Sequence, residues 1–142
     1  MMGSQPQRWA TDDPRRLREM LARSQNLASD HGLRSVIVGV AGREGDRLLP
    51  ELFAYLESAL RVEDSIFHMT RERAVLFLAD VGLERAREVL ERSISEFRNE
   101  FPSATGPQVG LGYFEVEPGS APLMLRDVLP RVFSADEADT AN

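Results

Sequence analysis

The chain has 142 residues, of which 42% are hydrophobic and 28% charged, proportions that are typical of one soluble globular domain. Its net charge of −6 disfavours a nucleic-acid partner, because such complexes draw most of their affinity from the neutralisation of phosphates. The absence of cysteine excludes disulfides and thiolate chemistry. No apolar run approaches the ~20 residues that a membrane span needs. We therefore expect a cytoplasmic domain without membrane insertion.

The spacing of apolar residues along the chain predicts a series of helices and strands. In chain order, the predicted elements are a helix over residues 14–31, a strand over 35–40, a helix over 47–61, strands over 65–69 and 74–79, a helix over 83–100, a strand over 109–116 and a short helix over 122–133. Asp12 or Asp13 is placed to cap the first helix, and Gly32 to end it. Gly110 and Gly112 interrupt the last strand, which indicates a bend or a close contact with another backbone.

Without the first and last helices, the order of elements is β-α-β-β-α-β. This order is typical of the α+β ferredoxin-like fold, in which an antiparallel sheet carries two helices on one face. The domain is predicted to span residues 12–133, with flexible tails over 1–11 and 134–142. Apolar residues surround the last helix, which Pro130 is expected to interrupt, and they are candidates for a surface that binds a partner.

The turn between the second and third strands is the most informative stretch of the chain. It reads Thr70-Arg71-Glu72-Arg73-Ala74, it is followed by the apolar strand, and Arg61-Val62-Glu63-Asp64 stands upstream of it. This frame resembles the diguanylate cyclase (GGDEF) family, in which an Arg-x-x-Asp motif, a strand, a five-residue signature and a second strand follow in the same order. Further matches in the expected order are Asp12-Asp13-Pro14, Gly45-Asp46 and Gln108-Val109-Gly110-Leu111-Gly112.

The resemblance implies a nucleotide-cyclase fold, and the departures from it imply a degenerate domain without catalysis. The family holds two divalent ions with carboxylates on the first strand and in the hairpin, whereas Gly39-Val40-Ala41 offers no carboxylate. Glu72 keeps one carboxylate in the hairpin, but Arg73 puts a positive charge beside it. Thr70 and Arg71 replace glycines that let the substrate lie against the backbone. We therefore expect no catalytic residue, no metal and no cofactor.

Arg61 and Asp64 stand at the spacing of the family's allosteric product site, which implies recognition of cyclic di-GMP. Arg61 can form paired hydrogen bonds with a guanine edge or a phosphate, and Asp64 can accept hydrogen bonds from guanine nitrogens. Arg71 or Arg73 is a candidate second cation for the doubly charged ligand. The structural alternative is an arginine that interacts with a helix C-terminus and an aspartate that forms a turn.

Three functions follow from these observations. The first is an inactive GGDEF-like regulatory domain that acts by binding, with cyclic di-GMP as the candidate ligand. The second is a ligand-free module for protein–protein interaction or homodimerisation. The third is a residual nucleotide cyclase with Glu72 as its remaining metal ligand.

Overall fold

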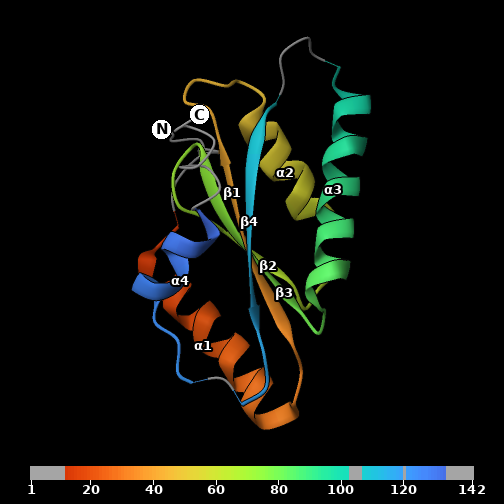
Figure 1. The fold of residues 1–142 in the computed structure, drawn as a ribbon. Coiled ribbons are helices and arrows are strands. Elements are labelled where there is room, and N and C mark those ends of the chain that lie inside the picture. The colour runs from red at the N-terminus through yellow and green to blue at the C-terminus, as the bar shows by residue number, and fades with distance from the viewer. Residues whose placement is uncertain (1–11, 103–106, 120, 134–142) are drawn as a thin grey trace, which may run out of the picture.

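The computed structural model describes residues 12–102, 107–119 and 121–133 and contains a four-stranded antiparallel sheet between two layers of helices (Figure 1). In chain order, its elements are α1 (Pro14–His31), β1 (Ser35–Gly42), α2 (Leu49–Ala59), β2 (Ser65–His68), β3 (Arg73–Ala79), α3 (Leu83–Glu100), β4 (Val109–Val116) and α4 (Leu125–Val132). The segments predicted as tails, 1–11 and 134–142, lie outside the described residues.

The sheet has the strand order β2-β3-β1-β4, and every neighbouring pair is antiparallel. This arrangement confirms the predicted α+β fold. Strand β1 lies between β3 and β4, so that Gly39 stands opposite Val75 on one side and opposite Gly112 on the other. Residues 35–41 of β1 are buried because helices cover both faces of the sheet, which explains their continuous apolar run.

The two faces of the sheet carry separate apolar cores. Because successive side chains of a strand point to opposite faces, Val36 and Val38 pack with α2 and α3 in one core, whereas Ile37 packs with α1 and α4 in the other. Figure 1 shows these two helical layers on opposite sides of the sheet. The pair predicted by the β-α-β-β-α-β order is α2 and α3, and α1 and α4 are the additional helices.

Both predicted ends of α1 are confirmed. Asp13 is the N-cap, and its side chain accepts a hydrogen bond of 3.0 Å from the backbone N–H of Arg15. Hydrogen bonds from the side chain of Arg15, and to a smaller extent the hydrogen bond from its backbone N–H, hold the pKa of Asp13 below its ordinary value. Gly32 ends the helix in the left-handed conformation, at φ 64°, which glycine adopts without a steric cost.

The predicted start of α2 and the predicted interruption of α4 differ from the structure for local reasons. Helix α2 begins at Leu49 rather than near residue 47, because Asp46 forms a turn in which its carboxylate accepts from the backbone N–H of Leu48 at 2.9 Å. Pro130 lies inside α4 and does not interrupt it, since the helix ends two residues later. None of the helices in the described part of the chain is long and apolar enough to cross a membrane.

Candidate functional site

The hairpin that carries the altered signature is a tight turn attached to the end of β1. The backbone N–H groups of Met69 and Thr70 both donate to the carbonyl of Arg73, at 3.0 and 3.1 Å. The N–H of Gly42 donates to the carbonyl of Glu72 at 2.8 Å. These bonds place the hairpin beside the C-terminal end of β1, where the family resemblance expects the metal-binding carboxylates.

The C-terminal end of α4 covers the same region of the sheet. A Cβ atom added to Gly39 would lie 2.5 Å from the carbonyl oxygen of Val132, and a Cβ atom on Gly112 would collide with the same oxygen. Next to this contact, the guanidinium of Arg73 lies 5.0 Å from the ring centroid of Phe133, a cation–π distance. The two glycines therefore admit a helix of the chain itself to the sheet surface.

The residues at this end of the sheet do not fit a pair of divalent cations. Carboxylates would be needed at positions such as Gly39 and Ala41, but Ala41 is buried and a side chain at position 39 would meet Val132. Within the described residues, no three His, Cys, Asp or Glu side chains are grouped as a metal site would require. Glu72 thus stands as a single carboxylate between Arg71 and Arg73 in the turn.

Arg61 and Asp64 form a closed cluster at the opposite end of β2. The Nε and Nη2 atoms of Arg61 donate to the two oxygens of Asp64, each at 3.0 Å, which is the paired geometry of an arginine–carboxylate bridge. The backbone N–H of Arg61 donates to Asp64 at 3.1 Å, and that of Ala79 at 3.0 Å. Nη2 of Arg61 also donates to the carbonyl of Ala79. The cluster connects the end of α2 to the end of β3.

The two members of this cluster differ in their exposure to solvent. The side chain of Asp64 is only 5% exposed, whereas that of Arg61 is 50% exposed. The hydrogen bond to Asp64 raises the pKa of Arg61 above its ordinary value, and the charges of Asp64, Glu63 and Asp80 act in the same direction. The hydrogen bonds from the Arg61 side chain to other described residues use its Nε and Nη2 atoms, while half of the side chain remains exposed to solvent.

A cavity of about 260 Å³ adjoins the Arg61–Asp64 cluster. Its polar lining comes from Arg61, Asp64 and Arg85, and its apolar wall includes Leu60 and Val89. Arg85 lies in the first turn of α3, where its Nη1 is 3.8 Å from an oxygen of Glu88. Two guanidinium groups therefore border one small cavity with an apolar wall, a combination that suits a planar base joined to a phosphate.

The structure brings together some of the residues predicted for the ligand site and separates others. Arg61 and Asp64 are in contact, as their spacing predicts. Arg71 lies in the hairpin at the far end of β2 and β3, away from them. Arg85 was missed, because the charges along residues 84–92 are typical of a solvated helix face. No sequence signal would have found it, since its place beside Arg61 depends on how α3 packs against the end of α2.

Known proteins resemble this chain in structure but not in sequence. Neither a family model nor a curated protein sequence matches the chain. Among solved structures, the GGDEF domain of FimX from Pseudomonas aeruginosa matches with a TM-score of 0.74 and 14% identity, over 99% of this chain and 96% of that one. The GGDEF domain of DgcB from Caulobacter crescentus, in complex with c-di-GMP, matches with a TM-score of 0.73 and 12% identity, over 99% and 92%.

A third match is PelD from Pseudomonas aeruginosa, also in complex with c-di-GMP. It has a TM-score of 0.65 and 21% identity, over 89% of this chain. This chain covers 46% of that PelD structure, so it corresponds to a part of it. The described part of the chain, with four helices and four antiparallel strands, therefore has the fold of a GGDEF domain. At these sequence identities the likeness establishes the fold alone, whereas the ligand depends on the side chains that line the site.

Proposed function

We propose that this chain is a catalytically inactive GGDEF-like domain that acts by binding, and that cyclic di-GMP is its ligand. The proposal combines the fold with the cluster at the end of α2. DgcB and PelD, which share the fold, were solved in complex with c-di-GMP. Arg61 and Asp64 keep the Arg-x-x-Asp spacing that the family resemblance connects with this dinucleotide.

The observation that carries the proposal is the orientation of Arg61. Asp64 and the carbonyl of Ala79 hold one edge of its guanidinium, while the side chain remains half exposed at the mouth of the cavity. An arginine held in this way loses little side-chain entropy when it binds a phosphate or the acceptor edge of guanine. Asp64 is then a positioning residue, because hydrogen bonds within the chain already occupy its oxygens.

Arg85 is our candidate for the second cation in place of Arg71. It lines the same cavity as Arg61, whereas Arg71 lies in the hairpin at the other end of β2. A ligand with two phosphates gains from two cations on one side of it, because charge-assisted hydrogen bonds are stronger than neutral ones. The apolar wall that includes Leu60 and Val89 offers a surface for the face of a base.

Three features support a lack of catalysis. The first strand has no carboxylate at Gly39 or Ala41, the hairpin has arginines on both sides of Glu72, and the backbone of Val132 occupies the sheet surface beside Gly39. A cyclase must hold metal ions and a triphosphate in this region, and metal-assisted phosphoryl chemistry fails when the ligand set is missing. We therefore expect no dinucleotide product from GTP in the presence of magnesium or manganese.

Calorimetry with cyclic di-GMP tests the proposal. The wild-type chain should bind saturably, and Arg61→Ala and Arg85→Ala should each weaken binding by at least about tenfold, the loss expected for a charge-assisted hydrogen bond. The matched control is Arg23→Ala, an exposed arginine on α1 that does not line the cavity. No binding to the wild-type chain would reject the ligand, and equal weakening by the control would reject the site.

The competing function is an interaction module without a nucleotide ligand, either a homodimer or a domain that binds another protein. It would be favoured if calorimetry detects no cyclic di-GMP binding while light scattering detects self-association. The residual cyclase would be favoured by a dinucleotide product that disappears in Glu72→Gln, because Glu72 is the carboxylate that the hairpin retains.

A further inference from the structure

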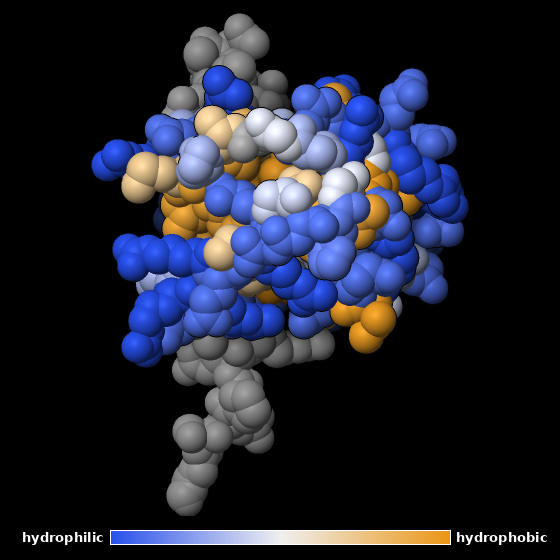
Figure 2. Space-filling model, turned by 90° about the horizontal axis from the view of Figure 1, so that it is seen from below, coloured by the Kyte–Doolittle hydropathy of each residue, from blue (hydrophilic) through white to orange (hydrophobic). Residues whose placement is uncertain are grey.

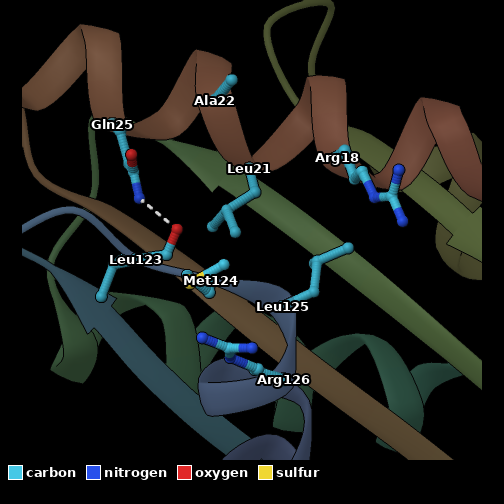
Figure 3. Close-up of a pocket in the computed structure, with 8 residues that line it drawn as sticks. All are labelled: Arg18, Leu21, Ala22, Gln25, Leu123, Met124, Leu125 and Arg126. Atoms are coloured by element: carbon cyan, nitrogen blue, oxygen red, sulfur yellow. Dashed lines mark hydrogen bonds between the residues drawn. The ribbon is translucent and has the colours of Figure 1, made fainter.

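A cavity with a mainly apolar lining lies on the other face of the sheet from Arg61. It is a groove of about 520 Å³ between α1 and the segment that leads into α4. Its lining residues are Arg18, Leu21, Ala22, Gln25, Leu123, Met124, Leu125 and Arg126. Figure 3 shows Leu21 projecting from α1 toward the segment of residues 123–125. This volume lies within the ~300–1,000 Å³ of small-molecule sites.

The floor of the groove is apolar and accessible. Leu21 is buried at its base, while Met124 is 48% exposed, one of the large hydrophobic side chains that the described chain leaves in solvent. Ala22 is exposed on α1 and contributes no bulk. In the view from below, hydrophobic residues show through a mostly hydrophilic surface on the side of α1 and α4 (Figure 2). Apolar surface of this kind favours an apolar ligand.

The charged residues of the groove are of one sign. Arg18 from α1 and Arg126 from α4 line it, and none of the lining residues that the structure describes is an aspartate or a glutamate. In the part of the chain that the structure describes, neither guanidinium takes part in an ion pair or hydrogen bond. Two arginines without an acidic partner among the described residues are unusual in a chain of net charge −6, where acidic residues outnumber basic ones. The groove therefore attracts an anion to an apolar surface.

The walls of the groove are held in place without a ligand. The Nε2 atom of Gln25 donates a hydrogen bond of 3.1 Å to the carbonyl of Leu123, which connects α1 to the segment before α4 (Figure 3). Leu123 and Leu125 also pack against the core that α1 shares with the sheet. A groove that exists before binding spares the ligand the cost of ordering it.

We propose that this groove binds a small amphipathic anion, a molecule with an apolar body and one carboxylate, phosphate or sulfonate group. The apolar body lies on Leu21 and Met124, and the anionic group is held by Arg18 and Arg126. The site is separate from the proposed dinucleotide site, because its residues belong to the α1 and α4 layer rather than to α2 and α3. The inference about this groove therefore does not rest on whether cyclic di-GMP binds.

Fluorescence titration with 8-anilinonaphthalene-1-sulfonate tests the proposal, since this probe is an apolar aromatic anion. The wild-type chain should bind it saturably at one site, and decanoate should displace it at a lower concentration than decanol, which lacks the charge. Absence of saturable binding up to ~1 mM would overturn the proposal, because such weak affinity is not that of a formed site. Equal displacement by decanol would overturn the role of the arginines.

Four variants locate the binding. Arg18→Gln and Arg126→Gln should each weaken binding of the sulfonate by about tenfold, and Ala22→Phe, which fills the groove from an exposed position, should abolish it. Arg23→Gln, the next exposed arginine of α1, is the matched control and should change little. Far-ultraviolet circular dichroism would verify that each variant is folded. Weakening by Arg23→Gln to the same extent, or unchanged binding to Ala22→Phe, would overturn the assignment.

Displacement of the probe by an acidic apolar peptide, but not by decanoate, would also overturn the proposal. In that case the groove would be a site for a partner protein. A small anion and a peptide differ in the surface that they need, because a peptide extends beyond the eight residues of the groove.

Discussion

The carbonyl oxygen of Val132 lies directly over Gly112, in the space that a Cβ atom at this position of β4 would occupy. The same oxygen closes the space above Gly39, the partner of Gly112 across the β1–β4 ladder. The end of α4 thus rests on a pair of facing glycines. This contact explains why β1 has a glycine at position 39 and β4 a glycine at position 112.

Substitution of either glycine should destabilise the fold. Gly112→Ala or Gly39→Ala should lower the free energy of unfolding by about 1–3 kcal/mol, the usual cost of overpacking, because the neighbouring atoms are backbone and cannot move aside easily. Urea denaturation followed by circular dichroism measures the change. Ser95→Ala, on the exposed face of α3, is a control that should change stability by less than about 0.5 kcal/mol. Stability unchanged in both glycine variants would contradict the packing of α4.

Asp64 should matter more for stability than its partner Arg61. Asp64→Ala leaves the N–H of Ala79 and the guanidinium of Arg61 without their acceptor and should cost about 1–3 kcal/mol. Arg61→Ala removes a half-exposed side chain and should cost less, although it should remove more ligand affinity. Urea denaturation of the two variants shows which substitution lowers the free energy of unfolding more. The reverse order would indicate that Arg61 is chiefly a structural residue.

Tyr113 carries a buried hydroxyl without a hydrogen-bond partner in the described part of the chain. Tyr113→Phe should therefore leave stability unchanged or raise it by up to about 1 kcal/mol, while keeping the ring contact with Arg87. A loss of more than about 1 kcal/mol would show that the hydroxyl has a partner in solution.

The same residue gives a pH dependence with a definite sign. Burial, with a further contribution from Glu91, raises the pKa of Tyr113 from 10.0 to about 12. A raised folded-state pKa means that its contribution to stability is complete below pH 10 and is lost as the pH rises toward 12. Wild-type stability should therefore fall more steeply than that of Tyr113→Phe over this window. Parallel curves of stability against pH for the two proteins would contradict the raised pKa of Tyr113.

Asp13 should show the opposite dependence. Its hydrogen bonds with Arg15 hold its pKa below 3.8, so its stabilising effect is present above that pH and is lost as the pH falls through the lowered value. The difference in melting temperature between the wild-type chain and Asp13→Ala should be larger at pH 6 than at pH 3. Asp30→Ala, in the last turn of the same helix, should cause no such loss, because an acidic residue there does not stabilise the helix.

The elements of the fold could be predicted from the sequence where local chemistry determines them. The bounds of α1, α3 and β4 agree with the prediction because a capping Asp13, an amphipathic repeat and a clear apolar strand mark them. The close backbone contact indicated by Gly112 is confirmed. Its partner, Val132, could not be foreseen, because the contact joins segments that only the packed fold brings together.

The candidate sites depend more strongly on tertiary structure. The contact of Arg61 with Asp64 follows from their spacing, but the share of Arg85 in the cavity depends on the packing of α3. Apolar residues near the last helix indicated a binding surface, yet the groove also needs Arg18 and Gln25 from α1. Charged residues on helices look alike in sequence whether they face solvent or a cavity.

The most direct test of the central proposal is a nuclear magnetic resonance titration of the labelled chain with cyclic di-GMP. Saturable shifts of backbone amides should be confined to residues 59–64 and 79–86, around Arg61, Asp64 and Arg85. The signals of the hairpin, including Arg71, should remain unchanged. Shifts centred on residues 69–73, or no shifts at all, would contradict the proposal that this fold binds the dinucleotide through its Arg-x-x-Asp cluster.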